Sequence, residues 1–288
     1  MRFGISSFIA LTLATGAIAA QPAARYLSIN PPILSPRKHE PGVIHPASNV
    51  NHLSSSSMEL ERREDCDDDH DSDHGPGSDP QTYAKPSSCA QIQKRCNIRV
   101  THASNGTVLG FVSPVWNRHG EYGIIQTNQN GSLEVSFSFS PKSPTQLDLL
   151  ATNHVNKTYP YMGATVGFVS PSNDLVVGGY NYLFITGTTK IPAGPPVGAD
   201  NNSFGGTTGI PKSAESAIWT YNRATKDLTP QWVNTNGSIP TSYVVYANDF
   251  NNAFVMVGDL GVFGKTFGKT YPLIKFTCVA PDSAYESE

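Results

Sequence analysis

The sequence of 288 residues lacks the short motifs that mark the common catalytic centres. It contains no G-x-S-x-G nucleophile elbow, no H-E-x-x-H zinc motif, no P-loop and no G-x-G-x-x-G dinucleotide fingerprint. The sequence therefore favours a non-catalytic role over an enzyme, and we expect no cofactor.

Charge is also scarce, because Asp, Glu, Lys and Arg make up only 15% of the chain. Residues 96–280 hold 11 Lys and Arg against 9 Asp and Glu, so this part carries no strong net charge. Phosphate binding requires a basic face. Nucleic acid is therefore excluded as an expected partner.

Long hydrophobic runs are absent, except for one at the N-terminus. Residues 1–19 carry Arg2, an apolar run from Phe8 to Ile18 and a small-x-small ending, which is the pattern of a secretory signal peptide. The run is too short for a membrane anchor, and the tail at 281–288 is polar. We expect a secreted protein, located outside the cell or in the cell wall.

Cysteine is rare, and its even count of four suits disulfide bonds in a secreted chain. Cys96 precedes the first expected strand and Cys278 lies in the last, so a bridge between them would join the ends of the domain. Cys66 and Cys89 would then form a second bridge. The other two connectivities keep leader and domain covalently linked.

A sustained helical period is missing throughout. From residue 96 to 280, short β-branched and aromatic runs alternate with Gly, Pro, Asn and Ser clusters. The stretch at 133–139 alternates strictly, which predicts a strand with one buried face. We predict a single all-β domain, an antiparallel β-sandwich or jelly-roll-like fold.

Residues 20–95 are rich in Pro, Ser and acidic side chains, and they have too few apolar residues for a core. We predict a disordered leader or pro-segment. Dibasic pairs ending at Arg63 and Arg95 predict proteolytic processing, although each pair also suits an ordinary surface.

The leader contains "DCDDDHDSDHG", which raises the question of a metal site. The spacing does not fit an EF-hand, because Gly75 falls one place late and no Glu stands at position 12. A looser set could bind a transition metal weakly, but the tract is more typical of a solvated acidic linker or pro-segment, because blocks of like charge are usually disordered. The members of that set are Asp69, His70, Asp71, Asp73 and His74.

Few side chains of the domain suit acid–base chemistry. His119 and Glu121 lie together in "WNRHGEYG" and could exchange a proton, while Asp148 and Glu215 lie in apolar stretches that could raise their pKa. A glycosidase needs two carboxylates facing one cleft. The sequence does not bring any two together, so these residues are weak catalytic candidates and could equally be ordinary structural groups.

Trp116, in the loop after Pro114, is the candidate for an exposed platform that stacks on a sugar, with core packing as the alternative. Glycosylation is expected from the N-x-Ser/Thr sequons. These sequons lie at Asn105, Asn130, Asn156, Asn201 and Asn236.

Several stretches of the domain resemble a group of uncharacterised secreted proteins of basidiomycete fungi. They include "GEYG", "SPTQLDLLATN", "YPYMGATVGF", "GYNYLFITGTT" and "ESAIWTYN…LTPQWVNTNGS". The resemblance covers residues 96–280 and implies an origin in a fungal secretome. It supplies no catalytic residue, ligand or cofactor.

Taken together, these features predict a secreted, glycosylated, non-catalytic protein that binds a cell-wall glycan or another extracellular surface. The alternatives are a secreted polysaccharide hydrolase that uses a carboxylate pair, and weak metal binding by the acidic His/Asp tract.

Overall fold

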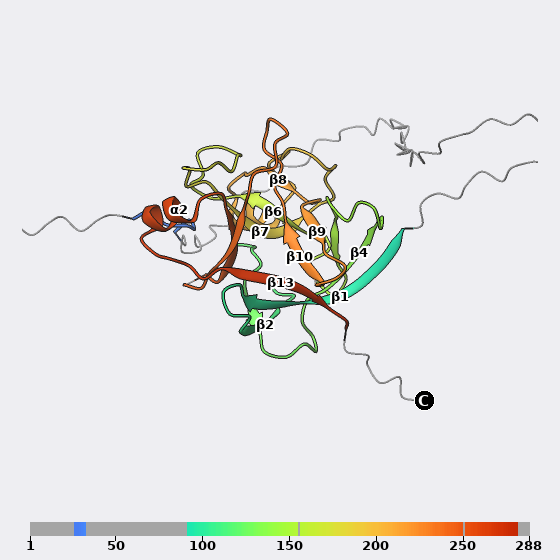
Figure 1. Cartoon of the computed structure of the whole chain (residues 1–288). Helices are drawn as coiled ribbons and strands as arrows, with labels where there is room; N and C mark the ends of the chain where they lie inside the picture. Colours follow the sequence, from blue (N-terminus) through green and yellow to red (C-terminus); the bar gives the residue numbers. More distant parts are fainter. Residues whose placement is uncertain (1–25, 33–90, 155, 250, 282–288) are drawn as a thin grey trace, which may run out of the picture.

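The computed structural model describes residues 26–32, 91–154, 156–249 and 251–281. Thirteen strands and two short helices make up this part of the chain. Figure 1 shows the strands wrapping around a common interior, with helix α2 on the outside. Neither helix has the length and apolar content needed to cross a lipid bilayer.

All strands belong to one sheet in which every pairing is antiparallel. The strands are β1 (Ile92–His102), β2 (Val108–Val112), β3 (Ile125–Gln126), β4 (Glu134–Phe139), β5 (Leu149–Ala151), β6 (Tyr161–Val166), β7 (Tyr182–Thr188), β8 (Ala214–Glu215), β9 (Trp219–Tyr221), β10 (Asp227–Pro230), β11 (Tyr243–Ala247), β12 (Ala253–Val257) and β13 (Ile274–Val279). The main path runs β11-β12-β7-β6-β5-β4-β1-β13-β10-β9, with β2 and β3 beside β1 and β8 beside β6.

The prediction of a single all-β antiparallel domain is confirmed, with the strands joined in one continuous sheet that curls into a half-barrel. Its interior is the larger hydrophobic core. Strand β4 illustrates why the sequence folds this way, since Val135, Phe137 and Phe139 are buried and the serines between them face outward. This alternation is the one predicted from the sequence.

Strands β7 and β12 are buried on both faces. Leu183 and Ile185 face the main core, whereas Tyr182 and Phe184 face a second hydrophobic cluster on the outer side of the sheet. A strand covered on both sides needs a continuous apolar run, and both strands have one.

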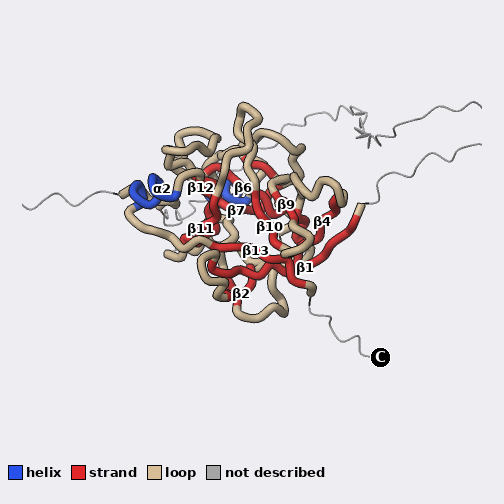
Figure 2. The backbone as a smooth tube through the Cα atoms, viewed as in Figure 1, coloured by secondary structure: helices blue, strands red, loops and turns tan. Residues whose placement is uncertain are grey.

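The second cluster lies under helix α2 (Leu260–Phe267), which presents Phe263 and Phe267 to it. Figure 2 shows this helix beside β11 and β12. The side chain of Asp259 caps its first turn by accepting from the Val262 amide, and Gly268 ends it with a positive φ of 70°. The other helix, α1 (Ser203–Thr208), is a single turn capped by Asn202.

Strand β1 begins before the expected domain boundary at Cys96. Residues 92–95 pair with 136–139 of β4, so they belong to the domain rather than to a disordered leader. The second half of β1 pairs with β13 and β2. The predicted Cys96–Cys278 disulfide is present, and it links the first and last strands inside the main core.

The leader prediction is also wrong for residues 26–32, which lie against α2 and β7. Ile29 is 7% exposed and belongs to the second hydrophobic cluster. Tyr26, Leu27 and Ile29 are apolar, but the run is too short to show a helical or strand periodicity in the sequence. It is long enough to place Ile29 in the second hydrophobic cluster. The rest of the leader, the signal peptide and the tail from residue 282 lie outside the described residues.

Candidate functional site

The loop between β2 and β3 is organised by Asn117. Its Oδ1 accepts from the amides of His119 (2.9 Å) and Glu121 (3.1 Å). Its Nδ2 donates to Glu121 Oε2 (2.7 Å) and to the carbonyl of Asn251 (2.8 Å). One amide side chain thus fixes the loop and attaches it to the β11–β12 turn.

Two glycines allow this loop to pack closely. Gly120 has a positive φ of 81°, and a Cβ there would overlap the carbonyl of Ser203 in α1. A Cβ at Gly123 would overlap the carbonyl of Asn252. The loop is therefore held between α1 and the β11–β12 turn, and Glu121 is carried inside.

Glu121 is 0% exposed. Burial raises the pKa of its carboxyl to about 8, against the opposing effect of hydrogen bonds from Asn117 and Asn30, while the charge of Asp249 raises it further. Oε2 accepts from Asn117 and from Asn30 Nδ2 (3.4 Å), but Oε1 has no hydrogen-bond partner in the described part of the chain. This environment favours the neutral acid of Glu121 over the carboxylate.

His119 is buried in the same loop, and no described residue forms a hydrogen bond with its Nδ1. Burial and the charge of Arg118 lower its pKa, against a hydrogen bond to the backbone of Pro31. No hydrogen bond joins His119 to Glu121. Both residues lie beneath residues 26–32, so the predicted acid–base pair does not face solvent.

Asp148 and Glu215 have different hydrogen-bond partners, although the partner of Asp148, Ser216, is the neighbour of Glu215 in the chain. Ser216 Oγ donates to Asp148 Oδ1 (2.6 Å), and burial raises the pKa of this carboxyl. Both oxygens of Glu215 accept from the Val233 amide at 3.2 and 3.3 Å, and burial raises its pKa to about 9. Each acid is thus engaged by a separate internal partner.

Trp116 is half-buried rather than displayed. Its ring packs against His154 in a tilted arrangement at a centroid distance of 4.1 Å, and it forms an edge-to-face contact with Tyr122 at 6.1 Å. A Cβ at Gly187 would overlap the indole, so the strand backbone lies directly against it. This packing favours the alternative role of Trp116 in the core over that of a sugar platform.

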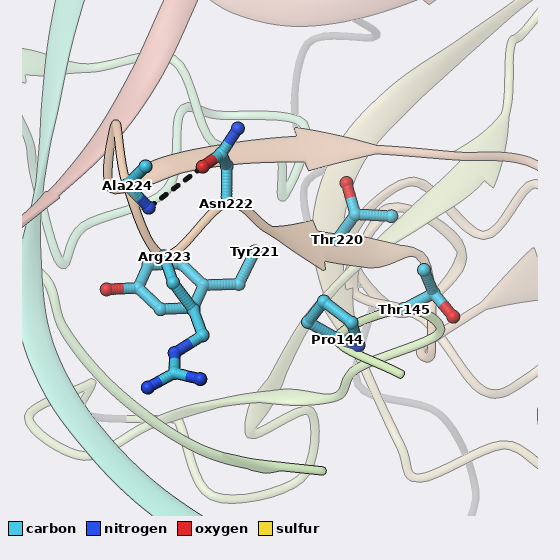
Figure 3. A pocket seen from close by; sticks show the side chains of 7 residues that line it. All are labelled: Pro144, Thr145, Thr220, Tyr221, Asn222, Arg223 and Ala224. Atoms are coloured by element: carbon cyan, nitrogen blue, oxygen red, sulfur yellow. Dashed lines mark hydrogen bonds between the residues drawn. The ribbon is translucent and has the colours of Figure 1, made fainter. Parts of the chain in front are cut away.

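Three of the surface pockets formed by the described residues have no Asp or Glu in their lining. The pocket in Figure 3 has a volume of about 490 Å³ and lies between the β9–β10 hairpin and the loop before β5. Its lining residues are Pro144, Thr145, Thr220, Tyr221, Asn222, Arg223 and Ala224.

Arg223 is the only ionisable side chain of this pocket apart from Tyr221. Within the described part of the chain, its guanidinium makes no hydrogen bond or ion pair, although its charge lowers the pKa of Tyr221 against the larger effect of burial. Arg223 is not among the site residues predicted from the sequence. Its signal there is weak, since it is the Asn-Arg pair of the "TYNRAT" turn between two strands.

The five sequons fall at different depths. Asn105, Asn130, Asn156 and Asn236 are exposed. Asn201 is partly buried, and the hydroxyl of Ser203 in the same sequon donates to the Gly120 carbonyl at 2.5 Å. The asparagines of four sites are therefore exposed in the folded domain, although Ser132 of the Asn130 sequon is buried.

Arg95 lies within β1, where its guanidinium pairs with Glu134 at 2.5 Å. The predicted processing site at Arg95 is thus part of a paired strand. Arg63, Cys66 and Cys89 lie outside the described residues, as does the acidic tract with Asp69, His70, Asp71, Asp73 and His74. Among the residues that the structure does describe, no group of three His, Cys, Asp or Glu side chains is placed to hold a metal.

Comparison with known proteins adds no assignment, since no family model, no curated protein and no solved structure matches the chain.

Proposed function

We propose that this is a secreted, non-catalytic protein that binds an extracellular or cell-wall glycan in the pocket beside the β9–β10 hairpin. The signal-peptide pattern supports secretion, and the Cys96–Cys278 disulfide suits an oxidising compartment. The resemblance to fungal secreted proteins supports a fungal cell wall as the setting.

The observation that supports the proposal most strongly is that no Asp or Glu side chain lines the three pockets described above. The three acids with raised pKa, Glu121, Asp148 and Glu215, each engage an internal hydrogen-bond partner. Retaining and inverting glycosidases both need two carboxylates beside the bond that breaks. An open pocket without a carboxylate suits binding without turnover.

The lining of the pocket suits a sugar. Thr145 contributes a hydroxyl and Asn222 an amide nitrogen, and such groups hydrogen-bond sugar hydroxyls. The Thr220 hydroxyl already donates to the Thr229 carbonyl, and Asn222 Oδ1 accepts from the Ala224 amide. Figure 3 shows Arg223 and Tyr221 projecting from the hairpin, with Pro144 and Thr145 on the adjacent loop. The unengaged guanidinium of Arg223 favours a glycan that carries carboxylate groups.

The test is a pull-down of the purified protein on insoluble wall polysaccharides, both neutral and uronate-containing, with assay of released reducing sugar. We expect retention on a uronate-containing glycan without sugar release. Replacing Arg223→Ala should weaken retention about tenfold, as loss of one charge-assisted hydrogen bond would do.

The matched control is Lys265→Ala, which removes one positive charge from α2, away from this pocket. It should leave retention unchanged. Equal retention by the Arg223→Ala variant would reject the pocket. Release of sugar that stops in a Glu121→Gln or Asp148→Asn variant would replace the proposal with a hydrolase.

A further inference from the structure

Residues Tyr26–Pro32 contact the domain as a bound peptide does. The Leu27 amide donates to the carbonyl of Thr266 in α2 (3.3 Å), and the hydroxyl of Tyr182 donates to the carbonyl of Ile29. The side chain of Ile29 enters the second hydrophobic cluster. The ring of Tyr26 lies on Gly268, where a Cβ would overlap it. Backbone hydrogen bonds and one buried anchor are the usual elements of peptide recognition.

Figure 1 shows this segment beside α2, far along the chain from its next described residue, Gln91. The site that holds it is formed by α2, the Tyr182 end of β7 and the loop that carries His119 and Glu121. We call this surface the segment site. It is separate from the pocket of Figure 3, which shares no residue with it.

Asn30 and Glu121 form a polar contact between the segment and the domain, and two atoms of this pair remain without a hydrogen bond among the described residues. Asn30 is 5% exposed, and its Nδ2 donates to Glu121 Oε2. The two other polar atoms of the same pair, Asn30 Oδ1 and Glu121 Oε1, are both buried, and neither has a hydrogen-bond partner among the described residues. A carboxylate can only accept hydrogen bonds, but a carboxylic acid can donate one. A proton on Oε1 would supply the donor that Asn30 Oδ1 lacks.

We propose that the segment site binds Tyr26–Pro32 as a separable peptide, held by a two-way hydrogen-bonded pair between the Glu121 carboxylic acid and the Asn30 amide. This pair recognises an asparagine one residue after an apolar anchor. The segment therefore stays bound after the connecting chain is cut.

The connecting chain contains a predicted processing site, because the dibasic pair ending at Arg63 lies between the segment and the domain. No cysteine precedes residue 66, so a cut at Arg63 leaves no disulfide to retain the N-terminal piece. Among the residues that the structure describes, only those of the segment site would hold the two pieces together.

Charge around Glu121 makes the contact sensitive to pH. Asp249 faces it from the β11–β12 turn, Tyr182 from β7, and His119 and Arg118 lie in its own loop. Burial holds the pKa of Glu121 at about 8, and the pKa of His119 below its usual value. Ionisation of Glu121 removes the proton shared with Asn30 and places a second negative charge near Asp249. Burial is the largest effect on this pKa, and the Asn30 hydrogen bond opposes it. We therefore expect binding to be stronger in acid and to weaken as the pH rises through about 8.

The test uses the full chain with a recognition site for a sequence-specific protease inserted at residues 53–57. After cleavage, the protein is passed through a size-exclusion column at pH 5 and at pH 9, and each peak is identified by intact mass. We expect the N-terminal piece to co-elute with the domain at pH 5, with affinity at least about tenfold weaker at pH 9.

Three variants make the result specific. Glu121→Gln keeps the two-way pair without a titratable group, so co-elution should persist at both pH values. Asn30→Leu should abolish co-elution at both. Leu27→Ala is the control, because this side chain is 45% exposed and only its backbone makes the hydrogen bond to α2.

Circular dichroism of each cleaved variant reports whether the domain remains folded. Separation of the wild-type pieces at pH 5 would refute the proposal. Release at pH 9 from the Glu121→Gln variant would refute the acid–amide pair. Neither result bears on the glycan pocket, which is tested separately by Arg223→Ala.

Discussion

At the scale of single residues, the domain keeps several acids where a charged carboxylate is poorly solvated. Glu215 is 2% exposed, and the Val233 amide is the donor that both of its oxygens share. Removal from water raises the pKa of a carboxyl because the ionised form loses the most solvation. The free energy of unfolding therefore depends on pH through such an acid.

Replacing Glu215→Gln should therefore stabilise the protein at pH 8. The pKa of Glu215 is about 9 in the folded state against 4.5 as its ordinary value, so its contribution is complete below pH 4.5 and declines as the pH rises towards 9. Glutamine keeps the acceptor without this decline. We expect a gain of about 2–4 kcal/mol in the free energy of unfolding at pH 8, measured by urea titration. At pH 4 the two proteins should be equal, and a gain of the same size there would contradict the explanation.

Trp116→Ala should lower stability rather than remove an exposed binding surface. Truncating a large packed aromatic costs about 3 kcal/mol, and the ring of Trp116 packs on His154 and the backbone of Gly187. Thermal unfolding measures the loss, with Val115→Ala as a control because that neighbour is 54% exposed. An unchanged melting temperature together with lost glycan retention would instead support Trp116 as an exposed sugar-binding residue.

The sequence could indicate which residues carry unusual chemistry, but not their partners. An acid inside an apolar stretch is recognisable, and the pKa of Asp148 and of Glu215 is indeed raised. The partners Asn30 and Asn117 are common polar residues, and Asn30 lies 91 positions away from Glu121. No local pattern joins residues so far apart, because their proximity depends on the folded sheet.

At the scale of elements, strand β1 decides where the domain begins. Its residues 92–95 hydrogen-bond to β4, and Arg95 forms an ion pair with Glu134. A protease must draw several residues of its substrate into an extended conformation, which a paired strand cannot provide without opening.

The folded protein should therefore resist a dibasic-specific protease at Arg95. Cleavage there requires local unfolding of β1, whose population is small in a central strand. N-terminal sequencing of the digested native protein should find no chain that begins at Cys96, whereas the reduced and denatured protein should yield one. A native digest that starts at Cys96 would mean that β1 opens readily.

Elements with a clear period were predictable and those without one were not. The alternation in β4 and the continuous apolar runs in β7 and β12 follow directly from which faces are buried. Helix α2 has only eight residues and contains two glycines, so its pattern is weak. Its real signals are the caps, Asp259 and Gly268, which a search for periodicity does not weigh.

At the scale of the whole molecule, the disulfide closes a loop of 182 residues between the first and last strands. The Cys96→Ser and Cys278→Ser double variant should lose up to about 5 kcal/mol of unfolding free energy, because its unfolded chain gains freedom. The fold itself should persist, since β1 and β13 keep their six register pairs. Urea titration measures the loss, and far-ultraviolet circular dichroism checks the fold. A variant without strand signal would show that pairing alone is insufficient.

The position of β1 between β4 and β13 also determines when the sheet can be completed during synthesis of the chain. A ribosome that adds roughly 5–20 residues per second needs roughly 10–40 seconds to go from Cys96 to Cys278. Throughout that interval one edge of β1 has no neighbouring strand, and an open edge is a template for aggregation. The sheet cannot close before the last strand emerges, so a nascent chain stopped short of β13 should be a substrate for chaperones rather than a partly working domain.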